Sequence, residues 1–239
     1  MGKVALVVPC YGAVVRPVDT EHAMRVLRAL GEEVEVVDGV CCGQPAFNSG
    51  YREEAKDVGT AFLREAQRFD AAVMASGSCV GMVRHYLPGL FEEGKRAGAE
   101  RIGRRVWEFT SYVAQHPSLG SLGLRMAGTV TYHDSCHARR EMGISEMVLG
   151  VLEAIEGLDV RRLSYEEECC GFGGTFSVKL PEVSVAMMTG KLADVSGTGA
   201  RVLVSTDLSC LAHLQAGAEG VGMRLETWTV AELLSRALP

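Results

Sequence analysis

The sequence is short of the features that mark membrane, secreted and nucleic-acid-binding proteins. No apolar run approaches the roughly 18–20 residues that a membrane-spanning helix needs. After the lysine at position 3, only six apolar or small residues follow before the first cysteine, too few for the core of a signal peptide. The net charge is −6 and no basic stripe is present, which argues against a nucleic-acid partner. We therefore expect a cytoplasmic protein with no transmembrane segment and no nucleic-acid partner.

Nucleotide-binding signatures are missing as well. Neither a GxGxxG motif nor a phosphate-binding loop follows a predicted strand, so a nicotinamide enzyme is not expected. The composition is otherwise that of a folded protein, because 47% of the residues are hydrophobic and only 7 of 239 are prolines. This length allows one large domain or two of about 100–120 residues.

Eight cysteines are the unusual feature of the chain. In a reducing compartment, cysteines at this density are more often metal ligands or redox groups than disulfides. They fall into two sets of one form, in which an adjacent pair lies between two single cysteines. The sets are Cys10, Cys41, Cys42 and Cys79, and then Cys136, Cys169, Cys170 and Cys210. Equivalent members are 126, 128, 128 and 131 residues apart, which indicates an internal duplication.

The segments between the cysteines repeat the same order of predicted elements. Buried-strand patterns run up to the cysteines at 3–10, 33–40 and 71–79 in the first half, and at 128–136, 159–167 and 201–210 in the second. Helical patterns cover 20–30, 51–69, 145–156 and 181–195. Each half closes with a short strand that enters a helix, at 104–116 and 224–238.

Strands that alternate with helices predict a mainly parallel sheet with helices on both faces. The predicted fold is therefore α/β, with two duplicated, doubly wound, Rossmann-like domains related by a pseudo-two-fold axis. We expect an N-terminal domain at 1–118 and a C-terminal domain at 126–239. The stretch 116–128 is rich in glycine and serine and lacks periodicity, so it is the predicted linker.

The cysteine positions point to a ligand site. In an open α/β sheet, ligands bind outside the carboxyl ends of the strands, and each half places its cysteines there. We expect the four sulfurs of each half to converge into a metal or cluster site. The glycines beside the pairs would let the backbone approach a bulky inorganic ligand and donate N–H groups to its sulfurs. These glycines are Gly43, Gly171, Gly173 and Gly174.

Three other interpretations of the cysteines remain open from the residues alone. Single cysteines are often small buried hydrophobic residues, and oxidation can pair them as disulfides. Tetrahedral zinc in each half is the third, although its usual paired CxxC motifs are absent. A metal or cluster site is the leading interpretation, with zinc as the alternative.

The two CCG triplets resemble the cysteine-rich CCG-domain family. Its pattern is a cysteine, a gap in the thirties, CCG, a second gap in the thirties and then CxxC. The gaps here are 30 and 36 residues in the first half and 32 and 39 in the second. That family includes the B subunit of heterodisulfide reductase and the iron–sulfur subunit of glycolate oxidase. The segments YHDSCHARRE, ECCGFGGTFSVK and DLSCLAH are similar to its short, two-domain lactate-utilisation type.

This resemblance implies an iron–sulfur electron-transfer subunit of a complex that oxidises L-lactate, a 2-hydroxy acid, to pyruvate. It implies iron–sulfur clusters, and four thiolates per half could hold one [4Fe–4S] cluster, or a variant one, in each half. It also implies an oxidoreductase subunit that needs partner proteins, one of them a ferredoxin-type iron–sulfur protein. Two other functions remain open: a scaffold module with zinc or thiol sites, and a thiol redox subunit of the heterodisulfide-reductase kind.

The sequence departs from the family pattern at the last cysteine of each half. Where the fuller family has CxxC, this chain has Cys79-Val-Gly-Met82 and Cys210-Leu-Ala-His213. The disulfide-cleaving chemistry of the five-cysteine cluster is therefore not transferred to this chain. His213 is a candidate replacement ligand, whereas Met82 is expected in the core.

Two histidines flank the first cysteine of the second half. His133 and His137 lie three residues before and one residue after Cys136. An imidazole at either position could ligate a metal, donate a hydrogen bond to a cluster sulfur or transfer a proton. They are the candidate catalytic residues of the sequence.

Overall fold

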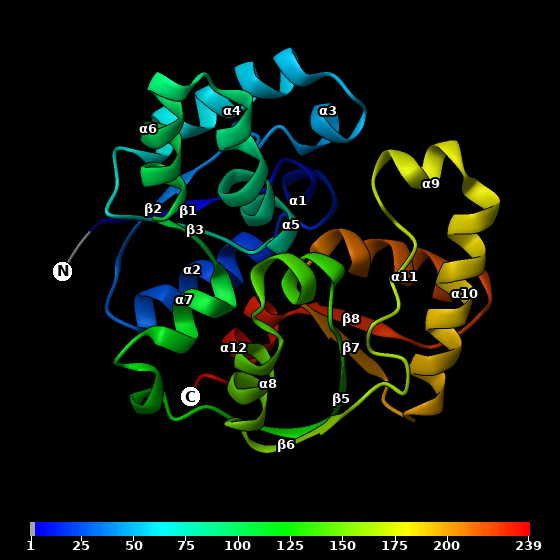
Figure 1. Cartoon of the computed structure of the whole chain (residues 1–239). Helices are drawn as coiled ribbons and strands as arrows, with labels where there is room; N and C mark the ends of the chain where they lie inside the picture. Colours follow the sequence, from blue (N-terminus) through cyan, green and yellow to red (C-terminus); the bar gives the residue numbers. More distant parts are fainter. Residues whose placement is uncertain (1–2) are drawn as a thin grey trace.

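The computed structural model describes residues 3–239, which form two four-stranded sheets, one from each half of the chain (Figure 1). The first sheet has the order β2-β1-β3-β4 and contains β1 (Lys3–Val7), β2 (Glu33–Val37), β3 (Ala71–Met74) and β4 (Val106–Glu108). The second has the order β6-β5-β7-β8 and contains β5 (Arg125–His133), β6 (Glu156–Arg161), β7 (Val202–Ser205) and β8 (Glu226–Thr229). All neighbouring strands are parallel. The α/β prediction is confirmed, and both halves share one strand order.

Helices cover both faces of each sheet. The outer helices are α4 (Arg52–Ala66) and α6 (Glu93–Gly103) on the first sheet, and α10 (Pro181–Gly197) and α11 (Leu208–Gly220) on the second. A layer between the sheets contains α2 (Asp19–Ala29), α7 (Phe109–Gln115), α8 (Ser145–Glu153) and α12 (Val230–Ala237). None of the helices in residues 3–239 combines the length and apolar character needed to cross a membrane.

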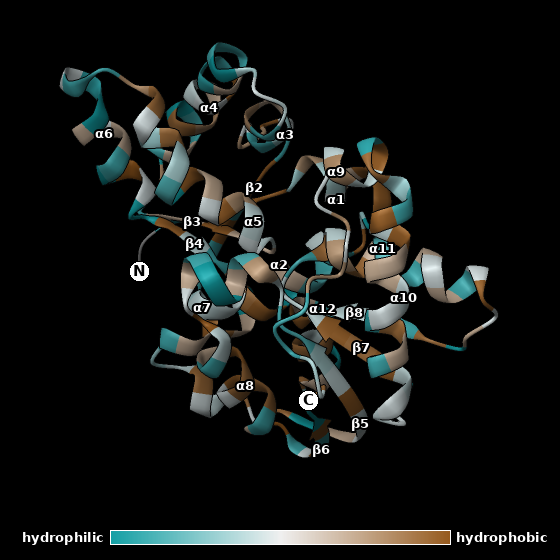
Figure 2. Ribbon diagram, turned by 45° about the vertical axis from the view of Figure 1, so that its right-hand side comes forward, coloured by the Kyte–Doolittle hydropathy of each residue, from teal (hydrophilic) through white to brown (hydrophobic). Residues whose placement is uncertain are grey.

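Alternate residues of the central strands enter different cores. In β1, Leu6 faces the helices between the sheets, whereas Val7 packs in the outer core with α4. In β7, Val204 faces inward and Leu203 belongs to the outer core with α10 and α11. Strands buried on both faces are apolar at nearly every position. Figure 2 accordingly shows β7 in brown, whereas the exposed helix α6 is banded in teal.

The inner core is common to both halves. Val26 of α2 and Leu234 of α12 belong to one buried cluster, although they lie in different halves of the chain. Helix α2 of the first half packs against α12 of the second. Their equivalents, α8 in the second half and α7 in the first, also pack against each other. Reciprocal contacts of this kind are produced by a two-fold relation between two copies. We keep 1–118 and 126–239 as the proposed limits of the halves.

A β-bridge between the halves marks the position of the two-fold axis. Ser76 and Asp207 form an isolated antiparallel β-bridge between the halves. Their separation, 207 − 76 = 131, equals the offset between the equivalent cysteines Cys79 and Cys210, so Ser76 and Asp207 are also equivalent. An antiparallel bridge between equivalent residues places the pseudo-two-fold axis between them.

Local elements differ from the sequence prediction at several places. The expected strands at 71–79 and 201–210 end at Met74 and Ser205, before the helices that contain Cys79 and Cys210. Helix α1 (Cys10–Val15) begins at the first cysteine, ten residues before the expected helix at 20–30. Strand β6 ends at Arg161, because the N–H groups of Ser164 and Tyr165 donate to the Asp194 carboxylate at 2.9 Å each and turn the chain. Strand β5 begins at Arg125, inside the predicted linker.

Several short helical segments complete the chain. They are α3 (Gln44–Asn48), α5 (Gly77–Gly81), α9 (Thr175–Lys179), the π-helical turns η1 (Met82–Tyr86) and η4 (His137–Met142), and the 3₁₀ turns η2 (Leu87–Leu90) and η3 (Leu119–Ser121). Most of them lie next to a cysteine, at the carboxyl edge of a sheet.

A partly buried ion-pair network joins the halves beside the inner core. The Arg16 guanidinium donates to Asp19 and to Glu232 of α12 at 2.8 Å each, and to the Thr227 hydroxyl at 3.1 Å. Both carboxylate side chains are less than a tenth exposed. Glu232 also pairs with Arg236 at 2.8 Å, so removing the Arg16 cation would leave Asp19 without its ion-pair partner in a largely dry environment.

Arg16→Ala should lower the free energy of unfolding by about 3–5 kcal/mol, because it leaves the buried Asp19 carboxylate without its partner. The chain should still unfold in one transition, since the inner core belongs to both halves. Arg96→Ala is the matched control, because Arg96 makes an exposed pair with Glu100. Such pairs contribute about 1 kcal/mol or less. Urea unfolding followed by circular dichroism measures both, and separate unfolding of the two halves would contradict the common core.

Candidate metal centre

The first four cysteines meet at the carboxyl edge of the first sheet. Cys10 follows β1 as the first residue of α1, the pair follows β2 in a loop, and Cys79 follows β3 within α5. The Sγ atoms of Cys10 and Cys41 lie 3.6 Å apart. Contacts between side chains continue from Cys41 to Cys42 and from Cys42 to Cys79. The four thiols therefore form one connected row.

The second four cysteines form the same row at the second sheet. Cys136 contacts Cys169, which contacts Cys170. The Sγ atoms of Cys170 and Cys210 lie 3.1 Å apart. The two rows run in the same order through equivalent residues. Each quartet is brought together by three separate strand ends, as sequence reasoning expected for a ligand site.

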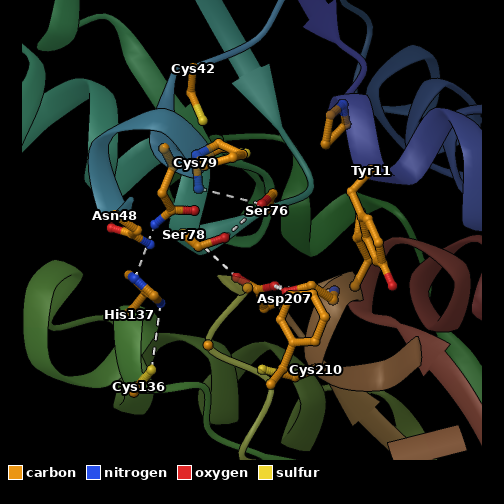
Figure 3. A pocket seen from close by; sticks show the side chains of 18 of the residues that line it. Tyr11, Cys42, Asn48, Ser76, Ser78, Cys79, Cys136, His137, Asp207 and Cys210 are labelled. Carbon is orange, nitrogen blue, oxygen red and sulfur yellow. Dashed lines mark hydrogen bonds between the residues drawn. The ribbon is translucent and has the colours of Figure 1, made fainter. Parts of the chain in front are cut away.

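Both quartets contribute to the wall of one cavity of about 190 Å³, which all the cysteines except Cys41 line. In Figure 3, Cys42 and Cys79 lie on one side of it and Cys136 and Cys210 on the other. The rings of Tyr11 and Phe172, one from each half, lie 5.6 Å apart at its wall. The sequence predicted a site in each half but gave no sign that both open into a common space, since that depends on how the halves pack.

One thiol in each quartet is predisposed to lose its proton. The pKa of Cys41 lies far below the ordinary value of 9.0, because the Cys10 and Cys42 thiols and the Gly43 N–H hydrogen-bond to its sulfur. The pKa of Cys169 is lowered in the same way, by hydrogen bonds from the Cys136 and Cys170 thiols and the Gly171 N–H. The first cysteine of each adjacent pair is thus held as a thiolate, which is the form that binds metals.

Two glycines allow the tight turns at the pairs. Gly43 and Gly171 have φ of +86° and +90°, which L-residues with a side chain rarely adopt. A Cβ atom on Gly43 would lie 2.6 Å from the Ala55 carbonyl oxygen, and one on Gly171 would lie 2.5 Å from that of Ser184. Each glycine N–H lies 3.4 Å from the first sulfur of its pair. The turns therefore direct backbone donors at the sulfurs.

The other two glycines singled out by the sequence shape the cavity wall. Gly173 and Gly174 line the cavity and have φ of +53° and +60°. They precede α9, and a Cβ on Gly173 would lie 2.8 Å from Phe176 Cβ. The backbone at this wall is thus open to the cavity without side chains.

Asp207 holds both helices that carry the last cysteines, a role that sequence reasoning missed. Its Oδ1 accepts from the Ser209 N–H at 3.2 Å and so caps α11, which contains Cys210. Its Oδ2 accepts from the Ser78 N–H at 3.0 Å, in the first turn of the helix that contains Cys79. No local pattern indicates the second partner, because Ser78 lies 129 residues away in the sequence.

His137 lies at the cavity between the two halves. Its Nδ1 lies 3.5 Å from the Cys136 sulfur, and its Nε2 lies 3.2 Å from the Gln44 side-chain nitrogen and 3.7 Å from Glu141. Glu141 also accepts a 2.9 Å hydrogen bond from the Tyr86 hydroxyl, which is partly exposed. Polar groups thus connect the cavity with the surface.

His133 and His213 occupy different surroundings. His133 is completely buried at the end of β5, and burial lowers its pKa to about 4. His213 packs against the Phe172 ring, with centroids 5.8 Å apart, and its Nε2 lies 3.4 Å from the Ser184 hydroxyl. Met82 is fully buried in the outer core of the first half.

The donor set fits a metal or an iron–sulfur cluster. Each half presents four soft sulfur ligands, which select zinc, copper(I) or iron–sulfur clusters over hard cations. Glycine turns bring backbone N–H groups to the sulfurs, as such clusters require. None of the eight cysteines is in a disulfide. The arrangement therefore supports binding of a metal or cluster by each half.

Glu108 is a buried acidic residue that lies close enough to Asp207 to feel its charge. It caps α7, where its carboxylate accepts from the Ser111 N–H at 2.8 Å and from the Thr110 hydroxyl at 3.1 Å. Complete burial raises its pKa to about 7, against the lowering effect of these hydrogen bonds.

The folded chain should lose stability as the pH rises from about 4.5 to 7. In that range the unfolded chain releases the Glu108 proton while the folded chain keeps it, so ionisation disfavours the fold by up to about 3 kcal/mol above pH 7. Glu108→Gln should remove this dependence, measured as the difference from wild type in urea unfolding of metal-free protein at pH 5 and pH 8. The exposed Glu93→Gln control should leave it unchanged. An equal pH response in wild type and Glu108→Gln would refute the buried titration.

Comparison with known proteins agrees with the duplicated site. The family model of the cysteine-rich domain, CCG, matches residues 4–84 and 130–215. "Lactate utilization protein A 1" of Bacillus anthracis (strain CDC 684 / NRRL 3495) is 32% identical over 239 residues, which cover 99% of both chains. "Lactate utilization protein A 1" of Bacillus mycoides (strain KBAB4) is 35% identical over 237 residues, covering 98% of this chain and 96% of the relative.

Solved structures show only distant likeness. An aspartate racemase homologue from Pyrococcus horikoshii OT3 has a TM-score of 0.35 at 13% identity, covering 99% of this chain and 96% of its own. Glutamate racemase from Francisella tularensis has a TM-score of 0.36 at 11% identity, covering 98% and 78%. The fold assignment rests on the strand order described above.

Proposed function

Because the chain belongs to the cysteine-rich CCG-domain family, we propose that it is an iron–sulfur electron-transfer subunit of a system that oxidises L-lactate to pyruvate. Full-length relatives named lactate utilization protein A support the substrate. The observation that carries the proposal is the pair of equivalent cysteine quartets that face one cavity.

Each quartet would hold one [4Fe–4S] cluster, with Cys10, Cys41, Cys42 and Cys79 as ligands in the first half and Cys136, Cys169, Cys170 and Cys210 in the second. When bound, such clusters carry single electrons. Oxidation of lactate to pyruvate releases two electrons and two protons. Two one-electron sites at one cavity match this number.

The chain's own residues prepare the cavity for this task. The Gly43 and Gly171 turns donate backbone hydrogen bonds to sulfur, which lowers the negative charge there. The Tyr11 and Phe172 rings form an aromatic part of the cavity wall. The Asp207 caps fix the helices of Cys79 and Cys210 relative to each other. These features favour electron transfer between the two halves.

His137 is the better placed of the two candidate catalytic histidines. It lines the cavity, whereas His133 is buried behind the cysteines. A proton taken up by His137 would have a polar route through Glu141 to Tyr86 near the surface. We assign to His137 the role of accepting a proton at the cavity.

Partner proteins complete the proposed system. The sequence has no flavin or nicotinamide signature, so a partner must deliver or accept the electrons. A ferredoxin-type iron–sulfur protein is the expected partner. Reduced thiols at this density favour a cytoplasmic location.

A thiol redox subunit is the second candidate function. The Sγ atoms of Cys170 and Cys210 lie 3.1 Å apart, close enough for a disulfide to form after a small movement. In that function the cysteines would exchange thiols and disulfides directly. A zinc scaffold is the remaining alternative, and metal analysis separates it from both.

Anaerobically prepared protein should contain about eight iron and eight sulfide ions per chain, as two [4Fe–4S] clusters require. Cys42→Ser should lose the first-half cluster and Cys170→Ser the second, so that each retains about half of the iron. Met82→Leu should keep all of it, because Met82 lies in the core. Iron and acid-labile sulfide assays with EPR of the reduced protein measure this. Zinc without sulfide would refute the proposal.

The isolated chain should show little lactate oxidation, because it holds only the electron-carrying part of the system. Activity should appear when the partner subunits are added to protein with intact clusters. The measurement is L-lactate turnover with an artificial electron acceptor, with and without partners. Steady turnover by the chain alone would show that the lactate-oxidising site lies within it.

A further inference from the structure

The imidazole of His133 has no hydrogen-bond partner in the described structure. The side chain is completely buried, and neither Nδ1 nor Nε2 contacts a donor or acceptor within residues 3–239. Its backbone is held firmly, because the Ser205 hydroxyl donates to the His133 carbonyl at 2.9 Å. Buried polar groups almost always have a partner, so two orphaned nitrogens on one ring require an explanation.

The ring lies beside two cysteine sulfurs. Ligand atoms of His133, Cys170 and Cys210 all lie within 4.8 Å of one another, and all three residues are buried. One ion placed among two thiolates and an imidazole is a common arrangement in metalloproteins. The unsatisfied nitrogen and the sulfurs therefore face the same small volume.

The first half has no equivalent group. The cysteine offset of 126 maps His133 onto Val7, which packs in the outer core. Lys191 also has an apolar equivalent in the first half. Gly43 packs on Ala55 as Gly171 packs on Ser184, so equivalent residues of these helices are 184 − 55 = 129 positions apart. This offset maps Lys191 onto Phe62. The two sites thus share their sulfurs but not their surroundings.

Charged groups around His133 come from several elements. Lys191 of α10 is buried, donates to the Tyr165 carbonyl and lies 3.8 Å from Asp194. The Lys191 ammonium, the Cys169 thiol and the Asp207 carboxylate all exert electrostatic effects on the His133 ring. The second-half site is therefore polar, whereas apolar side chains occupy the corresponding positions of the first.

We propose that His133 is a nitrogen ligand of the metal in the second-half site, where it takes the position of one of the four thiolates. That site is then mixed thiolate–imidazole, while the first is bound by thiolates alone. This inference rests on the proposed function only in requiring that the second quartet binds metal. A neutral imidazole in place of a thiolate removes one negative charge, and the Lys191 ammonium opposes the charge of the remaining thiolates. Both effects raise a reduction potential, so the second-half site accepts an electron before the first.

The first test uses full-length protein labelled with ¹⁵N-histidine, prepared anaerobically and reduced. Pulsed EPR should show a directly bound nitrogen in wild type, and the signal should be absent from His133→Val, which installs the residue of the first half. The exposed His85→Gln control should keep it. A bound nitrogen that disappears in His213→Gln, or an absence of bound nitrogen in wild type, overturns the inference. A wild-type spectrum without bound nitrogen overturns the inference even if His133→Val does not fold, and the His213→Gln spectrum shows whether a bound nitrogen belongs to His213 instead.

The second test uses metal-free protein and Co²⁺, so it does not depend on an iron–sulfur cluster. Wild type should bind Co²⁺ at the second half with an absorption spectrum of mixed nitrogen and sulfur ligation. His133→Val should bind it about tenfold or more weakly, with a sulfur-only spectrum, and Cys42→Ser should leave the second-half spectrum unchanged. An identical Co²⁺ spectrum in wild type and His133→Val overturns the inference.

The two tests separate this inference from the proposed function. Iron and sulfide without a bound nitrogen would leave the electron-transfer proposal standing and refute the ligand assignment. Mixed Co²⁺ ligation in protein that assembles no cluster would support His133 as a ligand and refute the iron–sulfur function. A redox titration adds a third reading, since His133→Val should bring the potentials of the two sites closer together.

Discussion

The arrangement of the site depends on the carboxylate of Asp207. One oxygen caps α11 of its own half and the other accepts from the first turn of α5 in the opposite half. The group is almost completely buried, so its charge is balanced by backbone dipoles and hydroxyls rather than by water. Because these two helices carry Cys79 and Cys210, a single buried side chain links the helices that hold the last cysteine of each quartet.

Features that depend on residues close together in the sequence, or on the spacing of the cysteines, could be predicted from the sequence. Apolar strand runs and cysteine offsets gave the parallel sheets, the duplication and the grouping of each quartet. Features that depend on packing between the halves could not be predicted in this way. Nothing near Asp207 indicates that Ser78 is its second partner, and nothing near His133 shows that both ring nitrogens are left without one. Helix α1 was missed because six residues are too few to show a period.

The two halves have kept their ligands and changed what surrounds them. Cys42 is enclosed by apolar residues that include Val7 and Phe62. Cys170 has His133 and Lys191 nearby instead. Thiolate ligation tolerates this divergence, because the sulfurs are held by the glycine turns and helix starts that both halves retain. The surroundings then tune each site without altering its primary ligands.

The inner helix layer has a consequence for the origin of this site. Contacts of α2 with α12 and of α8 with α7 are those of an isologous dimer, with the Ser76–Asp207 bridge on its axis. In a homodimer, every substitution is made twice, so a histidine gained beside one metal would appear beside the other. Joining the copies into one chain removes that restriction. A position such as Val7 can then stay apolar while His133 diverges. The two sites of a symmetric ancestor thereby become different, so that electrons pass between them in one order.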